Sequence, residues 1–80
     1  MALYKNGNYL QQSQDAIFDA EHEPGGTTPV SGIYRCIGCG LEIVSEQGRP
    51  FPPQNHHQHT PQQGAIRWRL IVYADHKPKQ

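Results

Sequence analysis

The chain has few of the residues that usually cross-link small proteins or attract charged partners. Its 80 residues include two cysteines, one tryptophan and one methionine, so a framework of several disulfide bonds is excluded. Seven acidic residues balance seven basic ones, and the formal net charge of zero gives no overall field that would draw the chain to nucleic acid or anionic lipid. No stretch approaches the run of about 20 apolar residues that crosses a membrane.

The N-terminal stretch MALYKNGNYLQQ also lacks the apolar run of a secretory signal. These two absences predict a cytoplasmic protein that makes no contact with membranes. In that reducing compartment Cys36 and Cys39 would stay thiols, and thiols can lose a proton and bind a metal as thiolates.

The size of the chain limits the core that it can build. Eighty residues suffice for one small domain, and only 35% of them are hydrophobic, while eight are glycine and seven are proline. A core of this size rarely supplies more than about 3–5 kcal/mol of stability. We therefore expect an additional cross-link, and the cysteine count favours a bound metal ion.

Three stretches have the pattern of β-strands. GIYRC at 32–36 is rich in β-branched and aromatic residues, and GLEIVSEQG at 40–48 alternates apolar and polar positions. The clearest alternation is in AIRWRLIVYA at 65–74, which predicts one apolar face formed by Ile66, Trp68, Leu70 and Val72. No stretch has the pattern of a helix of ordinary length. The predicted fold class is mostly β, with a small antiparallel sheet.

Long loops and arms make up the rest of the prediction. DAIFDAEH at 15–22 favours a strand or extended arm, whereas HEPGGTTPVSG at 22–32 has loop composition. RPFPPQN at 49–55 cannot be an interior strand because its prolines lack backbone donors. We expect a single domain over 1–80, with the core at about 32–74, an extended N-terminal arm at 1–31 and a polar tail at 75–80.

The two cysteines form one half of a candidate metal site. Cys36 and Cys39 stand in CIGCG, where a tight turn can aim both sulfurs at one point. Gly40 tolerates the positive φ that such a turn needs, and it lets backbone amides face the thiolates. We interpret this sequence as a metal-binding knuckle.

Histidines supply the other half of the site, since no further cysteine is present. Three of the five histidines lie in HHQH at 56–59, which gives the spacing C-x2-C-x16-H-x2-H. In paired zinc knuckles about 15–20 residues separate the two pairs, so the spacing fits. Two thiolates and two imidazoles form the tetrahedral set that zinc prefers. The predicted ligands of Zn2+ are Cys36, Cys39, His56 and His59.

The residues alone leave a choice between His56 and His57. His56 repeats the two-residue gap of the cysteine pair, whereas His57 and His59 would lie on one face of an extended segment. If His56 is the ligand, His57 points to solvent or supports the ligands from outside. His22 and His76 stand in polar surroundings, and we expect them to be ordinary solvated histidines.

GIYRCIGCG and the later GRPFPP resemble the small bacterial zinc-ribbon proteins. That family runs Gly-x-Tyr-x-Cys-x-x-Cys-Gly, then Gly, Pro-Pro, a second cysteine knuckle and often an aromatic strand. The resemblance covers about residues 32–70, and the matching positions are Gly32, Tyr34, Cys36, Cys39, Gly40, Gly48, Pro52, Pro53 and Trp68. Here QNHHQH replaces the second cysteine pair. The resemblance implies a β fold that is stabilised by a bound metal ion, but it does not imply a particular activity.

The stretches PGGTTPVSGIY and GRPFP have a weaker likeness to the short YjzC-like proteins, which are themselves uncharacterised.

These features favour a non-enzymatic zinc-binding module with a macromolecular partner that the sequence does not identify. A site with four protein ligands leaves no open position for a substrate. Nucleic-acid binding is the alternative, because Arg35, Arg67 and Arg69 could contact phosphate. Strand alternation, however, places Trp68 opposite these arginines, so it is not free to stack on bases.

Enzymatic readings have less support from the sequence. A thioredoxin-type redox pair needs a helix that begins at the first cysteine, and none is predicted there. A catalytic zinc would need a general base, for which Glu42 or Glu46 is the candidate.

Ile71 and Tyr73 interrupt the polar face of the last strand, so we expect the N-terminal arm or another subunit to cover them. Homo-oligomerisation therefore remains open.

Overall fold

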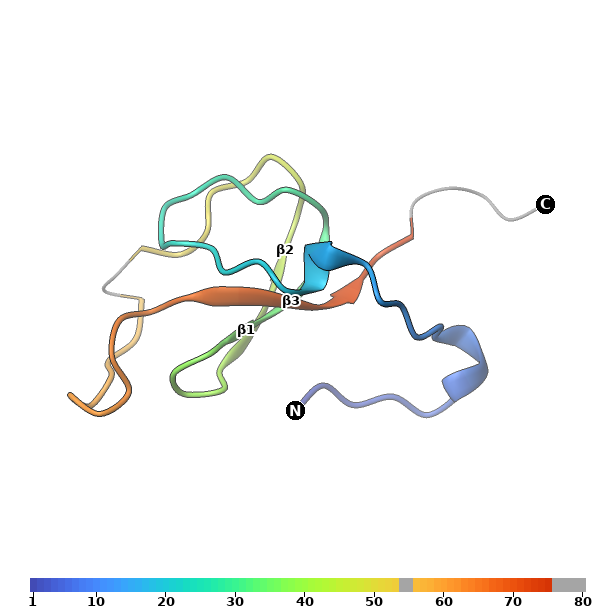
Figure 1. Ribbon diagram of the computed structural model, residues 1–80, viewed down its shortest axis with the longest axis horizontal. Helices are drawn as coiled ribbons and strands as arrows, with labels where there is room; N and C mark the ends of the chain where they lie inside the picture. The colour runs from blue at the N-terminus through green and yellow to red at the C-terminus, as the bar shows by residue number, and fades with distance from the viewer. Residues whose placement is uncertain (54–55, 76–80) are drawn as a thin grey trace.

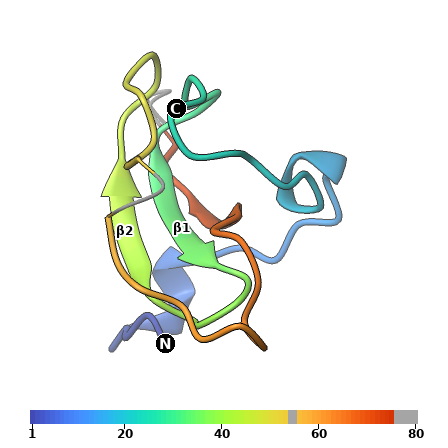
Figure 2. The same ribbon diagram turned by 90° about the vertical axis from the view of Figure 1, so that its left-hand side faces the viewer.

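The computed structural model describes residues 1–53 and 56–75. Its centre is a three-stranded antiparallel sheet of β1 (Gly32–Cys36), β2 (Glu42–Ser45) and β3 (Trp68–Tyr73), in the order β2-β1-β3. Figures 1 and 2 show β1 and β2 as a hairpin, with β3 on the other side of β1. The predicted mostly β fold class with a small antiparallel sheet is confirmed. Within the described ranges, no helix is long and apolar enough to span a membrane.

The core lies on one face of the sheet. Tyr34 and Cys36 alternate on β1, and they share this face with Trp68 and Leu70 of β3. Ile66 and Phe51 complete the group of large side chains that are at most 2% exposed. Trp68 and Leu70 lie in β3 and Ile66 lies two residues before it, as the alternation of this stretch predicts. Burial of side chains of this size supplies most of the hydrophobic stabilisation that so short a chain can obtain.

Val72 does not share the core face, so that part of the strand prediction is wrong. Tyr34 pairs with Leu70, but Ile33 pairs with Val72, which leaves one extra residue in β3. This β-bulge reverses the alternation of the strand. Val72 therefore lies on the outer face, where it lines a cavity of about 370 Å³ together with Ile33 and Val44.

The two proline-rich loops pair with each other above the core. Thr28 donates its amide to the Arg49 carbonyl at 2.8 Å, and Phe51 donates to Gly26 at the same distance. A buried hydrogen bond of 2.6 Å between the Thr28 and Ser45 hydroxyls joins this ribbon to β2. The pairing explains why Phe51, in a segment predicted as extended, is a core residue.

The N-terminal arm contains two short 3-10 turns, η1 (Gly7–Tyr9) and η2 (Ala16–Phe18). The strand or extended arm expected at 15–22 is therefore interrupted by a turn. The Asp15 carboxylate caps η2 by accepting the Ile17 amide at 3.0 Å. Phe18 packs against the core, and Figure 1 shows the rest of the arm running beyond β3. The arm and the end of β3, including Ile71 and Tyr73, line a shared cavity of about 680 Å³.

His22 is not an ordinary solvated histidine. Its backbone forms a two-bond bridge with Trp68, at 2.8 and 2.9 Å, and its ring stacks on Phe51 with centroids 5.2 Å apart. Burial lowers the pKa of His22, because the charged ring would lose its hydration. The other histidine expected to be solvated, His76, lies outside the described residues.

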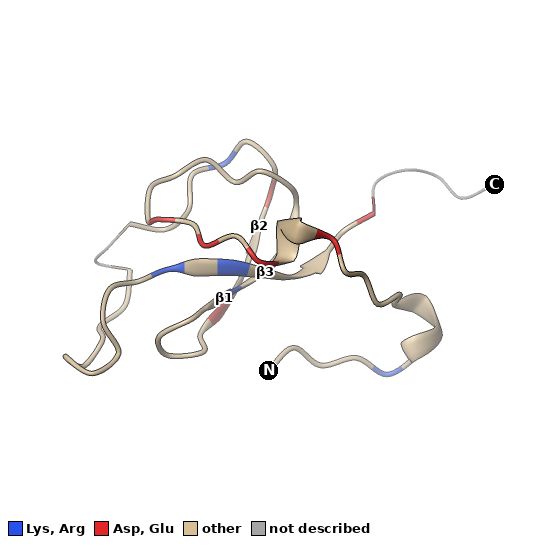
Figure 3. Cartoon of the chain, viewed as in Figure 1, with Lys and Arg blue, Asp and Glu red and all other residues tan. Residues whose placement is uncertain are grey.

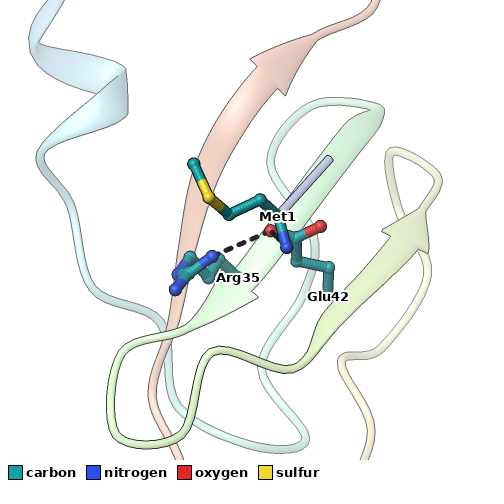
Figure 4. A network of polar contacts seen from close by, with 3 residues as sticks. All are labelled: Met1, Arg35 and Glu42. Carbon is teal, nitrogen blue, oxygen red and sulfur yellow. Dashed lines mark hydrogen bonds and ion pairs between the residues drawn. The ribbon is translucent and has the colours of Figure 1, made fainter. Parts of the chain in front are cut away.

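Charged side chains of the sheet form pairs on its outer face. Arg35 and Glu42 are opposite each other on β1 and β2, and they form an ion pair of 3.0 Å. The amino group of Met1 lies 3.5 Å from the same carboxylate, so the start of the arm returns to the sheet (Figure 4). Exposed pairs of this kind contribute about 0–1 kcal/mol each.

Candidate metal centre

The cysteine knuckle is the turn between β1 and β2. Cys36 ends β1, and its carbonyl accepts the Gly40 amide at 2.8 Å, while its amide donates to Leu41 at 2.7 Å. Gly40 has a φ of 83°, the positive value expected from the sequence. These bonds close the turn tightly and place both sulfurs on the same side of it, with Cys36 buried and Cys39 at the surface.

The segment that leads into β3 forms a backbone hydrogen bond with the cysteine knuckle. The Ile37 amide donates to the Arg67 carbonyl at 2.9 Å. Burial of its sulfur raises the pKa of Cys36, but hydrogen bonds to the sulfur, the largest from the backbone of Cys39 and others from the backbone of Arg67 and Gly38, outweigh it. The pKa is lowered to about 6, so the thiolate that a metal requires is present at neutral pH.

Two histidines from the loop before β3 face the sulfurs. The Nε2 atom of His59 lies 3.3 Å from the Cys36 sulfur, and Nε2 of His57 lies 3.3 Å from the Cys39 sulfur. The two Nε2 atoms are 3.0 Å apart. One donor atom from each of these residues lies within 4.8 Å of all the others, so this Cys2His2 group could hold a metal ion.

The spacing of the donor atoms fits a tetrahedral metal. Bonds of about 2.3 Å to sulfur and about 2.0 Å to nitrogen, at tetrahedral angles, separate two nitrogens by about 3.3 Å and a nitrogen from a sulfur by about 3.5 Å. The separations between these atoms, 3.0 and 3.3 Å, are close to those values. For these three pairs, the tetrahedral separations are longer by a few tenths of an ångström.

A backbone carbonyl sets the orientation of His59. Nδ1 of His59 lies 2.8 Å from the Gly64 carbonyl, which can only accept a hydrogen bond. The proton is therefore on Nδ1, and the unprotonated Nε2 faces the sulfurs, the tautomer that a metal ligand needs. Nothing in the sequence around Gly64 indicated this contact.

The histidine loop can approach the knuckle because residue 38 is glycine. A Cβ atom on Gly38 would lie 2.5 Å from the Gln63 carbonyl oxygen and 2.9 Å from Cε1 of His59. Both distances are shorter than non-bonded carbon atoms tolerate. The glycine between the two cysteines thus serves the close contact between the two halves of the site, a role that the knuckle pattern alone did not reveal.

His56, the predicted partner of His59, lies beside this group rather than within it. Its Nδ1 is 2.9 Å from Nδ1 of His57, on the side of the His57 ring that faces away from the sulfurs. The structure therefore brings together Cys36, Cys39, His59 and the alternative histidine, His57. The matched two-residue gap of His56 does not decide the pairing, because the His57 ring presents Nε2 to the sulfurs and His56 lies beside its other ring nitrogen.

The core residue Trp68 lies behind the histidine loop. The rings of His56 and His57 meet it edge-on, with centroids 6.0 and 5.7 Å from the Trp68 ring. Trp68 is fully buried, so it forms a fixed wall against which both imidazoles rest. A hollow of about 440 Å³ lies beside the loop, and it is lined by residues 57–61, Gly64 and Ile66.

The chain is similar over nearly its whole length to Protein L of Escherichia coli. The two are 49% identical over 81 residues, which cover 96% of this chain and 92% of the relative. No family model matches the chain, and no solved structure matches it. An identity of this level over almost all of both proteins shows common descent. The chain therefore belongs to the family of Protein L.

Proposed function

We propose that this chain is a zinc-binding protein whose metal is structural and whose folded domain serves as a binding or interaction module rather than an enzyme. The convergence of two cysteine sulfurs and two histidine Nε2 atoms within 4.8 Å is the observation that carries the proposal. Two sulfurs and two nitrogens in tetrahedral array are typical of zinc among the biological metals. A reducing compartment such as the cytoplasm suits the site, because both cysteines must remain thiols.

A structural role is supported by the position of the ligands in the chain. Cys36 and Cys39 close the β1–β2 hairpin, while His57 and His59 belong to the loop that leads into β3. An ion held by all four would join segments about twenty residues apart. Four protein ligands also fill a tetrahedral shell and leave no position for water or substrate.

The fold supports the resemblance to zinc ribbons. Such proteins place a cysteine knuckle at the tip of a hairpin in a small antiparallel sheet, and the knuckle of this chain has that position. Its second pair of ligands is histidine instead of cysteine. Imidazole is a competent ligand of zinc, so the replacement keeps the coordination number.

Exposed apolar side chains support an interaction role. Leu3 is 97% exposed and Tyr9 is 79% exposed on the arm, and Val44 is 79% exposed on the outer face of the sheet. Side chains of this size in a partner interface would bury area that this short chain cannot bury alone.

Acidic neighbours of two arginines weaken the case for nucleic-acid binding. Arg69 of β3 lies 3.4 Å from Glu21, and Arg67, just before the strand, lies 3.9 Å from Glu23. Figure 3 shows blue and red segments side by side along this strand. With Trp68 fully buried, the sheet offers no exposed tryptophan on which a base could stack.

Native mass spectrometry of the purified chain tests the proposal. We expect one zinc ion per chain in the wild type, and its loss in Cys39→Ser and in His59→Ala, each of which removes one donor. The matched control is Gln58→Ala, an exposed residue between the two histidines, which should retain the metal. A wild-type protein that carries no zinc after expression in zinc-containing medium would refute the proposal.

A further inference from the structure

His57 needs a partner that holds its proton on Nδ1. Its Nε2 is the donor atom, since it lies 3.3 Å from the Cys39 sulfur and 3.0 Å from Nε2 of His59. A neutral imidazole has one bare nitrogen and one N–H group, so the ligand tautomer of His57 must carry its proton on Nδ1. For His59 the Gly64 carbonyl fixes the same tautomer.

His56 occupies the corresponding place beside His57. Its Nδ1 lies 2.9 Å from Nδ1 of His57, within hydrogen-bonding distance. With the proton on His57, Nδ1 of His56 must be the acceptor, and the proton of His56 is then on its Nε2. The His56 side chain is exposed, so that Nε2–H can be hydrated.

The geometry fixes both rings in this arrangement. The planes of the two imidazoles are 88° apart with centroids separated by 5.2 Å, and both rings meet the buried Trp68 ring edge-on. His56 would have to turn away from His57 in order to bring a nitrogen among the sulfurs. In its present orientation it can support a ligand but cannot be one.

We infer that His56 is a positioning residue of the zinc site, which accepts a hydrogen bond from Nδ1–H of His57 and so holds Nε2 of His57 toward the metal. This inference rests on the proposed zinc-binding function. Hydrogen-bonding partners of metal-bound histidines typically contribute 10–100-fold to metal affinity. Loss of a positioning residue weakens binding without changing the atoms bound to the ion. Loss of a ligand changes the coordination of the ion as well, so the two roles can be distinguished.

Substitution of His56 by alanine and by asparagine separates the two roles. The Oδ1 atom of asparagine takes nearly the position of Nδ1 in histidine and accepts hydrogen bonds, but an amide oxygen is a poor ligand for zinc. We expect His56→Ala to bind zinc about 10–100-fold more weakly in competition with a chelator. His56→Asn should recover most of this loss, whereas His57→Asn should not.

Cobalt spectra and histidine NMR give readouts that do not depend on affinity. With Co2+ in place of zinc, wild type, His56→Ala and His56→Asn should share one tetrahedral S2N2 absorption spectrum. Nitrogen-15 NMR of the zinc-loaded wild type should show His57 protonated at Nδ1 and metal-bound at Nε2.

The inference would be overturned by unchanged zinc affinity in His56→Ala, by no recovery of affinity in His56→Asn, or by a changed cobalt spectrum in either variant. If the wild type binds neither metal, the proposed function fails and the inference fails with it; if only the His56 variants depart from expectation, the proposed function stands.

Discussion

Gly38 is the residue that allows the two halves of the metal site to meet. An added Cβ would press on the Gln63 carbonyl and on the His59 ring, so Gly38→Ala must push the histidine loop outward. We expect the affinity for zinc to fall by about 10–100-fold, the range found when the orientation of a ligand is no longer supported. Competition between the protein and a chelator measures the change.

Gly7→Ala is a suitable control for this substitution. Gly7 lies in the arm, and its added Cβ would meet only the end of the Tyr4 ring at 3.3 Å. This variant should bind zinc as the wild type does. Equal affinity in Gly38→Ala would show that the histidine loop does not pack on the knuckle as described.

The stability of the folded chain should depend on pH, because folding lowers the pKa of the Cys36 thiol. Its pKa is about 6 in the folded chain, against an ordinary value of 9.0. Between these values the unfolded state binds more protons, so this group contributes stability that is complete above pH 9 and is lost as the pH falls through 6. Denaturant unfolding of the zinc-loaded protein at a series of pH values should show the free energy of unfolding falling as the pH is lowered from 9 to 6. A free energy of unfolding that stays constant over this range would contradict the thiolate assigned to Cys36.

The cysteine half of the candidate site could be predicted from the sequence, and the choice of histidines could not. Cys36 and Cys39 are tied to each other by a short turn, so their spacing is enough to bring the sulfurs together. The choice between His56 and His57 depends on which ring nitrogen faces the sulfurs. That orientation follows from contacts with Gly64 and Trp68, and no local pattern of residues encodes them.

A buried pair of hydroxyl groups, on Thr28 and Ser45, joins the ribbon formed by the proline-rich loops to β2. Thr28→Val would leave the Ser45 hydroxyl buried without a partner, which costs about 1–3 kcal/mol. The double variant Thr28→Val with Ser45→Ala removes both groups and should recover much of the lost stability. Denaturant unfolding of the zinc-loaded variants measures these free energies.

The neighbouring Thr27 provides the comparison for that pair. It is exposed, so Thr27→Val should change the free energy of unfolding by no more than about 0.5 kcal/mol. A loss in Thr27→Val as large as that in Thr28→Val would mean that removal of any threonine hydroxyl from the ribbon, rather than of the buried hydroxyl pair, causes the effect.

The strands were easier to predict than their connections. β1 and β3 have alternating patterns because each buries one face, and their positions follow the sequence closely. The bulge that turns Val72 outward has no local signal, because it arises from the pairing with β1. The ribbon was also missed, since two loops rich in proline and glycine form it through contacts between distant residues.

The whole molecule has little to hold it together apart from the sheet and the metal site. Six large hydrophobic side chains form the buried core among the described residues. The chain extends over 47 × 26 × 20 Å, and Figure 1 shows η1 of the N-terminal arm at the end away from the histidine loop. Because structural zinc contributes about 10–16 kcal/mol of apparent binding free energy in small domains, an ion here would exceed the few kcal/mol expected of the core.

Removal of the metal from purified protein is the most direct test of this dependence. Far-ultraviolet circular dichroism reports the sheet while a coloured chelator extracts zinc, and the absorbance of the chelator reports how much zinc has been released. We predict that the β signal is lost in step with the zinc and returns when zinc is added back, with Gln58→Ala behaving as the wild type. A zinc-free chain that keeps the spectrum and the thermal unfolding transition of the loaded protein would contradict the account.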